Sequence, residues 1–241
     1  MAVTRYKVWD RTTRWFHWIN VVCVTALGTI GLILLNEKLL GVPSGGKITL
    51  KTVHVAFGYV FCLNLLWRFV WAFISNNRFA RWQAILPFRR GYARDLGRFL
   101  TGLRRGDISP YLGRNPLTRP MITLLLLLMT LQAGTGLLLA GTDLYQPPFG
   151  GMIAAWVAKP GKAAEVAPGS KENIDARKYA EMRKFRAPSV TVHIWTFYTL
   201  ALLIFLHVAA AVISDILEKN GLISSMFSGE KIFSDKPVDF E

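Results

Sequence analysis

The sequence predicts an all-α integral membrane protein, a four-helix bundle with both chain termini in the cytoplasm. Four apolar stretches approach or exceed the roughly 20 residues that span a bilayer, and the only formal charge within them is Arg68. Basic residues are concentrated between the second and third stretches, where positive charge marks the cytoplasmic side of a membrane. All four histidines lie within or at the edge of an apolar stretch.

The four stretches are expected to form transmembrane helices, because backbone polar groups in lipid must be satisfied within the segment itself. The first stretch follows basic residues and could be a signal peptide, but it is long and no small-residue cleavage site precedes Asn36, which favours a retained anchor. We expect one membrane domain over residues 1–241. Its spans are predicted at about residues 16–36, 53–74, 120–140 and 190–214.

The orientation follows from the arginines. Ten arginines and two acids lie between residues 75 and 119, which places this segment in the cytoplasm. Parity then places both termini there, including a tail over residues 215–241, and makes residues 141–189 an outer loop. That loop is long for a passive connection, so docking of a partner is one interpretation. The net charge of +14 could indicate nucleic-acid binding, but its position beside membrane spans argues against this.

The order of the spans predicts two pairs of histidines at two depths. His17 and His207 are expected near the inner face, and His54 and His193 near the outer face. His193 and His207 are separated by about 20 Å along one helix, so they cannot ligate one metal ion. Their spacing returns a helix to within roughly 40° of the same direction, so both face the same way.

Two pairs of histidines favour two haem b groups. A neutral imidazole is a common ligand of iron, and a porphyrin iron requires only two axial ligands. A zinc or copper site would want three or four converging ligands. Histidines that are merely hydrogen-bonded in the structure are the alternative. Covalent attachment of a c-type haem is excluded, since the chain has no Cys-x-x-Cys-His.

Three further residues are candidates for contact with haem. Gly58 lies four residues after His54, on the same helical face, where a small residue would let a flat macrocycle approach; close packing of helices is an equal alternative. Arg14 and Arg68 could neutralise haem propionates. The alternatives are a positive-inside anchor for Arg14 and snorkelling to the interface for Arg68.

Several segments resemble the bacterial cytochrome b-561 superfamily. Within it, the chain is similar to the membrane cytochrome b subunit of nickel–iron hydrogenases, chiefly at the end of the second span and in the tail. The segments that carry the resemblance are Val8–Arg11, Arg14–Trp18, His54 with Gly58 and Arg68, Arg68–Phe73, Asn115–Pro116, His193 with His207, and Leu222–Gly229.

The resemblance implies a di-haem cytochrome of the bacterial inner membrane that relays electrons between a periplasmic redox subunit and membrane quinone. That subunit would be a hydrogenase small subunit or a c-type cytochrome. Asn115 would lie near the quinone pocket, although Asn-Pro is also an ordinary helix-start signal. The chain would be an electron-transfer subunit rather than a complete enzyme. Two alternatives remain open: a stand-alone quinone oxidoreductase supplied by a small reductant, superoxide or a c-type cytochrome, and a non-redox membrane protein.

Overall fold

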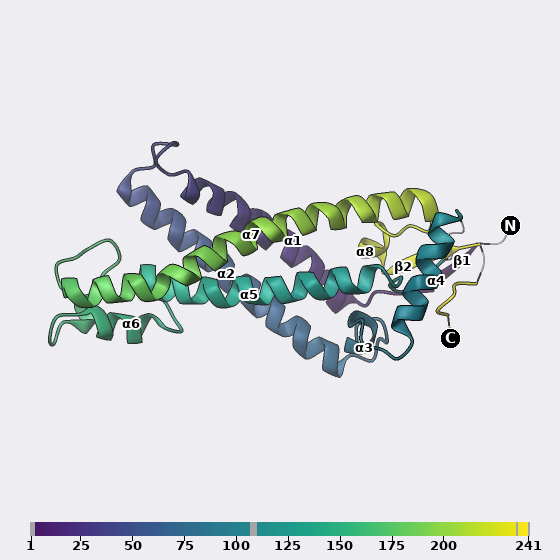
Figure 1. Ribbon diagram of the computed structural model, residues 1–241, viewed down its shortest axis with the longest axis horizontal. Helices are drawn as coiled ribbons and strands as arrows, with labels where there is room; N and C mark the ends of the chain where they lie inside the picture. Colours follow the sequence, from purple (N-terminus) through teal and green to yellow (C-terminus); the bar gives the residue numbers. More distant parts are fainter. Residues whose placement is uncertain (1–2, 107–109, 235, 241) are drawn as a thin grey trace. The chain divides into compact units, whose positions relative to one another are not determined.

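The computed structural model describes residues 3–106, 110–234 and 236–240 and is mostly helical (Figure 1). Within these residues, four helices are long and apolar enough to cross a membrane, which confirms the prediction of four transmembrane helices in a multi-pass membrane protein. All four exceed the predicted spans, because a helix satisfies its own backbone hydrogen bonds and can continue beyond the hydrocarbon region. They are α1 (Arg11–Leu35), α2 (Ser44–Ile74), α5 (Thr118–Leu144) and α7 (Ala176–Glu218).

Short elements occupy the connections between the long helices. The segment predicted as an outer loop is partly helical, since α5 extends into it, α6 forms within it and α7 begins before its end. The short elements are α3 (Trp82–Ile85), α4 (Tyr92–Arg104), α6 (Gly150–Val157), the 3-10 helix η1 (Ala163–Glu165) and α8 (Ser225–Ser228).

Two strands that the all-α prediction did not include join the ends of the chain. β1 (Thr4–Lys7) pairs antiparallel with β2 (Glu230–Phe233), with Thr4 opposite Phe233 and Lys7 opposite Glu230. Four-residue strands separated by most of the chain carry no local pairing signal, which is why the sequence did not predict them. The pairing places the N-terminal segment beside the tail.

The chain forms two compact units, and each long helix contributes residues to both. Unit 1 comprises Met1–Ile19, Asn64–Leu128 and Leu200–Glu241, and unit 2 comprises Asn20–Leu63 and Met129–Thr199. Within the two units, the apolar surface of the long helices is largely exposed. In the most apolar 18-residue stretch of α1, and in that of α7, only 6% is buried. A surface of this kind suits lipid rather than water.

Unit 1 packs the N-terminal segment, the arginine-rich connection and the tail around one apolar cluster. The cluster consists of Val8, Trp9, Phe79, Leu112 and Phe233. These three segments are the ones that parity places on one side of the membrane. In Figure 1, β1, β2, α4 and α8 lie together at the end of unit 1 that carries both termini, and α4 runs across the direction of the long helices.

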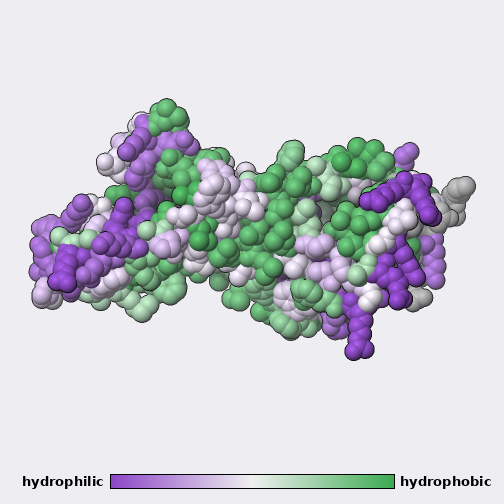
Figure 2. All heavy atoms as spheres, viewed as in Figure 1, coloured by the Kyte–Doolittle hydropathy of each residue, from purple (hydrophilic) through white to green (hydrophobic). Residues whose placement is uncertain are grey.

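Unit 2 carries a small folded cap over the connection between α5 and α7. Its apolar cluster consists of Ile153, Val157, Ile174 and Met182, and an isolated antiparallel bridge joins Ala158 to Ile174. Figure 2 shows hydrophilic residues gathered at this end of unit 2, with apolar residues over the long helices. The connection is therefore an ordered element rather than a structureless loop.

Candidate functional site

Each of the four histidines is half-buried on a long helix. His17 lies on α1, His54 on α2, and His193 and His207 on α7. The division into units separates them into two pairs, with His17 and His207 in unit 1 and His54 and His193 in unit 2. The predicted order of the spans gives the same grouping. Their role as metal ligands stays a prediction.

The imidazoles of His54 and His193 face each other in unit 2. Their ring centroids are 6.4 Å apart and their planes are inclined by 67°. A metal–imidazole bond is about 2 Å long and the ring centre lies roughly 1.2 Å beyond the nitrogen, so an ion ligated by both rings places the centroids about 6 Å apart. The observed centroid separation is close to this value. The Nδ1 atom of His54 is buried and has no hydrogen-bond partner.

Both imidazoles of this pair lie beside a glycine of a neighbouring helix. A Cβ atom on Gly136 of α5 would lie 3.3 Å from Cε1 of His193, and one on Gly31 of α1 would lie 3.6 Å from Cε1 of His54. The first distance is tighter than ordinary van der Waals contact, so glycine at position 136 admits the ring. Gly136 therefore makes room for the His193 ring, whereas the contact of Gly31 with His54 is an ordinary one.

His193 has hydrogen-bond partners on α5 at both ring nitrogens. Oγ1 of Thr135 is 2.9 Å from Nδ1, and Nε2 of Gln132 is 3.1 Å from Nε2 of the imidazole. These contacts come from a helix without a histidine of its own.

His17 and His207 lie in the same compact unit, on α1 and α7 respectively. The His17 ring makes an edge contact with Trp18, with centroids 5.2 Å apart. Trp18 packs against Phe227 of α8 at 4.4 Å and donates a 3.0 Å hydrogen bond to the carbonyl oxygen of Met226. The tail therefore contacts the turn of α1 that carries His17.

Arg14 and Arg68 are both engaged with backbone carbonyls in unit 1. Nη1 of Arg14 donates to the carbonyl oxygen of Phe227, and Nη2 of Arg68 donates to that of Ala80 at 3.0 Å. Arg68 is only 3% exposed, so it does not snorkel to a wet interface. Nε of Arg14 and Nη1 of Arg68 are buried without a partner, so each guanidinium keeps a donor that an anion could satisfy.

Gly58 and Asn115 have different surroundings. Among the described residues, no other helix or side chain lies within 4 Å of the position of a Cβ on Gly58, so close helix packing is not seen there and contact of Gly58 with haem stays a prediction. Oδ1 of Asn115 accepts hydrogen bonds from N and Oγ1 of Thr118, at 2.9 Å and 2.7 Å, at the start of α5. This is the helix-start role that Asn-Pro predicts, and the proximity of Asn115 to quinone stays a prediction.

Comparison with known protein families gives a match over residues 8–229 to the family described as prokaryotic cytochrome b561. The chain belongs to this family. The match confirms the resemblance predicted from the sequence, and the matched range includes all four histidines. Family membership implies b-type haem and electron transport in a membrane. No solved structure matches the chain.

Curated relatives of this cytochrome b561 chain bear the name probable Ni/Fe-hydrogenase B-type cytochrome subunit. The protein from Rhizobium leguminosarum bv. viciae is 26% identical over 95% of this chain and 90% of its own length. The protein from Bradyrhizobium diazoefficiens is 26% identical over 95% of this chain and 86% of its own. The Escherichia coli K12 protein, named as the hydrogenase 1 subunit, is 32% identical over 36% of this chain.

The residues around the histidines fit a b-type haem. The 6.4 Å separation of the His54 and His193 rings suits two axial ligands. Arg14 and Arg68 offer unpaired buried donors of the kind that propionate carboxylates accept. Within the described residues, no three or more His, Cys, Asp or Glu side chains gather as a metal cluster, and a porphyrin iron needs only two protein ligands.

Sequence reasoning missed an ion cluster beside the His54–His193 pair in this cytochrome b561 chain. The two carboxylate oxygens of Asp143 bind Lys51, at 2.5 Å, and Arg186. Lys51 lies three residues before His54, and Arg186 lies seven residues before His193, so helical periodicity places each on the face of its histidine. The same spacing rule that selected Arg14 could have found both.

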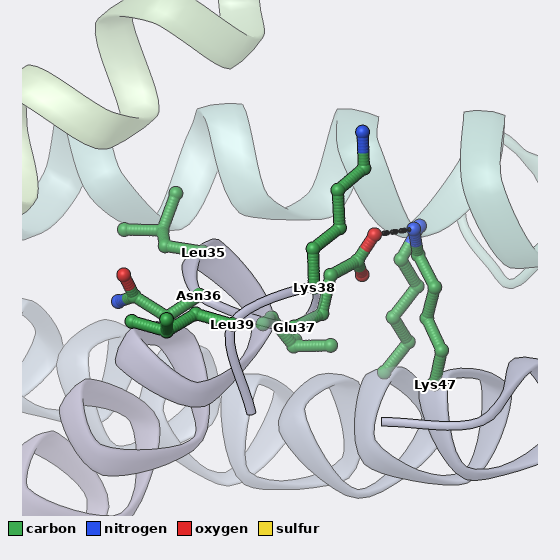
Figure 3. Close-up of a pocket in the computed structure, with 8 residues that line it drawn as sticks. Leu35, Asn36, Glu37, Lys38, Leu39 and Lys47 are labelled. Atoms are coloured by element: carbon green, nitrogen blue, oxygen red, sulfur yellow. Dashed lines mark hydrogen bonds and ion pairs between the residues drawn. The ribbon is translucent and has the colours of Figure 1, made fainter. Parts of the chain in front are cut away.

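A shallow cavity of about 540 Å³ lies in unit 2, at the turn between α1 and α2 (Figure 3), and Lys51 of the ion cluster is one of its lining residues. Figure 3 shows the carboxylate of Glu37 turned toward Lys47, with which it forms an ion pair. No histidine lines the cavity. It is lined mainly by the connection between α1 and α2, and it reaches the ion cluster only at Lys51.

Proposed function

We propose that this protein is a di-haem b-type cytochrome of the bacterial cytoplasmic membrane that relays electrons between a periplasmic redox partner and membrane quinone. The observation that carries the proposal is the grouping of the histidines, one pair in each unit, with the His54 and His193 rings 6.4 Å apart. Haem supplies one-electron redox chemistry when bound.

In this proposal the four histidines are axial ligands, with His17 and His207 at the inner haem and His54 and His193 at the outer one. Arg14 and Arg68 provide positive charge for inner-haem propionates. The long helices exclude water from both sites and so strengthen every electrostatic interaction within them. The protein thereby sets the geometry and electrostatics of the redox groups.

The names of the relatives support a hydrogenase as the periplasmic partner. The arginine-rich connection between α2 and α5 supports placement of unit 1 at the cytoplasmic side. The folded cap of unit 2 would then face the periplasm and be available to the partner. Asn115, at the start of α5, would lie on the quinone side.

The number of haems tests the proposal directly. Pyridine haemochrome analysis of the purified full-length protein should give about two b haems per chain, one for each bis-histidine site. A folded preparation without haem would refute the redox function. If wild type and His54→Ala each contained one haem per chain, the second site would be refuted.

The partner is tested in membranes. Hydrogen gas should reduce the cytochrome in membranes of the native host, and deletion of the hydrogenase large subunit should abolish that reduction while dithionite still reduces the haems. Reduction by hydrogen that survives the deletion would remove a hydrogenase from this role and favour the stand-alone oxidoreductase.

A further inference from the structure

The hydroxyl group of Thr135, on α5, contacts Nδ1 of His193. Oγ1 of Thr135 is 2.9 Å from Nδ1 of His193, and it also lies 2.9 Å from the carbonyl oxygen of Leu131 and 3.1 Å from that of Gln132. A carbonyl oxygen can only accept, so the single hydroxyl hydrogen goes to the backbone. The oxygen of Thr135 is then left to accept a hydrogen bond from Nδ1–H.

The contact of Gln132 with the other ring nitrogen of His193 fits the same protonation state. Its side-chain amide nitrogen is 3.1 Å from Nε2 of His193, and an amide nitrogen can only donate. Nε2 of His193 is therefore the acceptor and carries no hydrogen. In this amide orientation both contacts are satisfied by one tautomer, with the proton on Nδ1 and the lone pair on Nε2.

We propose that Thr135 is a positioning residue for the outer haem, which holds His193 in the tautomer and orientation that present Nε2 to the iron. This inference rests on the proposed function, in which His193 is an axial ligand. A ligating histidine ordinarily donates its other N–H to an acceptor, which fixes the ring and makes it a stronger donor to the metal. Gly136 completes the arrangement, since the ring edge lies where its Cβ would be, 3.3 Å from Cε1.

Gln132, unlike Thr135, would oppose iron binding by His193. It binds the lone pair of Nε2 that the iron requires, and its own Oε1 is buried without a partner. Gln132 thus competes with iron for Nε2, whereas Thr135 supports the ligand from Nδ1. The two neighbours on α5 are therefore distinguishable by substitution.

The test compares Thr135→Val with Thr135→Ser in the full-length, haem-loaded protein. Valine keeps the volume of threonine and removes the acceptor, whereas serine keeps the acceptor. Thr135→Val should raise the midpoint potential of the outer haem, because a weaker donor ligand stabilises the oxidised iron less. It should also change the low-spin electron paramagnetic resonance signal of that haem and speed its transfer to apomyoglobin by about 10- to 100-fold.

Three controls make the outcome decisive. Thr135→Ser should keep the wild-type potential and signal, and Gln132→Leu, which removes the competitor for Nε2, should not speed haem loss. Equal shifts in Thr135→Val and Thr135→Ser, or none in Thr135→Val, would overturn the inference. The proposed function fails separately, if His193→Ala retains both haems.

Discussion

Arg68 carries a buried charge, and the contacts of its guanidinium indicate the role of that charge. It is the only formal charge in the four predicted spans, and a buried ionisable residue in a membrane span is expensive. The structure gives its guanidinium the carbonyl oxygen of Ala80 and the ring of Phe16, whose centroid is 5.8 Å away. No carboxylate forms an ion pair with it among the described residues. A propionate is the anion that would complete this environment.

Replacing Arg68 should change the potential of the haem in unit 1. Arg68→Gln removes a positive charge that favours the reduced state, so the potential should fall. One charge at roughly 8 Å with an effective dielectric near 20 is worth about 2 kcal/mol, or on the order of 90 mV for one electron. A redox titration of both haems measures the shift.

Arg78→Gln is the matched control, since Arg78 is an exposed arginine that also donates to a backbone carbonyl, that of Asp239. It should leave both potentials unchanged. Equal potentials in Arg68→Gln and wild type would make Arg68 a purely structural residue that ties α2 to Ala80.

At the scale of elements, the tail and the start of α1 form one interlocked structure. Nε1 of Trp9 donates to Oγ of Ser225 at 3.1 Å, and the backbone nitrogens of Val8 and Trp9 both donate to the carbonyl oxygen of Gly229. Together with the contacts of Arg14 and Trp18, these bonds hold α8 against the turn that carries His17.

Gly229→Ala should release this contact. Gly229 has φ of 85°, and a Cβ there would lie 2.8 Å from the carbonyl oxygen of Trp9, so alanine adds both backbone strain and a clash. We expect a loss of about 1–3 kcal/mol of local stability and selective loss of the haem in unit 1 during purification, measured by the haem ratio and spectrum.

Gly97→Ala provides the contrast on α4, where no atom lies within 4 Å of the new Cβ. It should retain both haems and stabilise the helix by up to about 1 kcal/mol. Full retention of haem in Gly229→Ala would show that the tail does not support the His17 site.

Lys231 should make the stability of the β1–β2 pair depend on pH. Its Nζ donates to the carbonyl oxygens of Tyr111 and Gly113, and burial lowers the pKa of this lysine from 10.5 to about 8, with Glu218 and Asp239 opposing the shift. Below pH 8 the cost of burying the charge is fully present. From pH 8 to about 10.5 the unfolded state binds more protons, so stability rises with pH.

The gain is at most about 3 kcal/mol. Hydrogen exchange of the β2 amides, corrected for intrinsic rates, should therefore slow between pH 8 and 10. Burial raises the pKa of Tyr111, which opposes the gain above pH 10. Lys231→Met should abolish the rise between pH 8 and 10; an unchanged pH profile in that variant would assign the effect to another group.

The sequence predicted the elements that depend on local composition and missed those that depend on distant contacts. The long apolar stretches predicted all four spanning helices, because hydropathy and helical geometry act along the chain. The pairing of β1 with β2 and the contact of the tail with Trp9 could not be predicted, since each joins residues more than 200 positions apart. The ordered cap around Ile153 and Met182 was not predicted because its contacts join separate segments of the connection between α5 and α7.

At the scale of the site, helical spacing identified the histidines but not their partners. Burial and depth follow from position along a span, so His54 and His193 could be paired in advance. The hydrogen bonds of Thr135 and Gln132 depend on which face α5 turns toward α7. The 27 residues of α5 include a run of leucines without a polar face, so periodicity could not orient this helix.

At the scale of the whole molecule, the two units each hold one histidine from α7 and one from another helix. In the proposed function, each unit would therefore contain the ligands of one bis-histidine site. Loss of either partner should empty one site and leave the other intact, because axial ligation needs both imidazoles.

Single substitutions of the four histidines test this organisation. His17→Gly and His207→Gly should remove one and the same component of the reduced-minus-oxidised spectrum, and His54→Gly and His193→Gly should remove the other. Added imidazole should restore the missing component wherever the side chain acts as a ligand rather than as a structural group. The assignment of one haem to each unit would be contradicted if His17→Gly lost the same spectral component as His193→Gly. It would also be contradicted if added imidazole never restored a missing component.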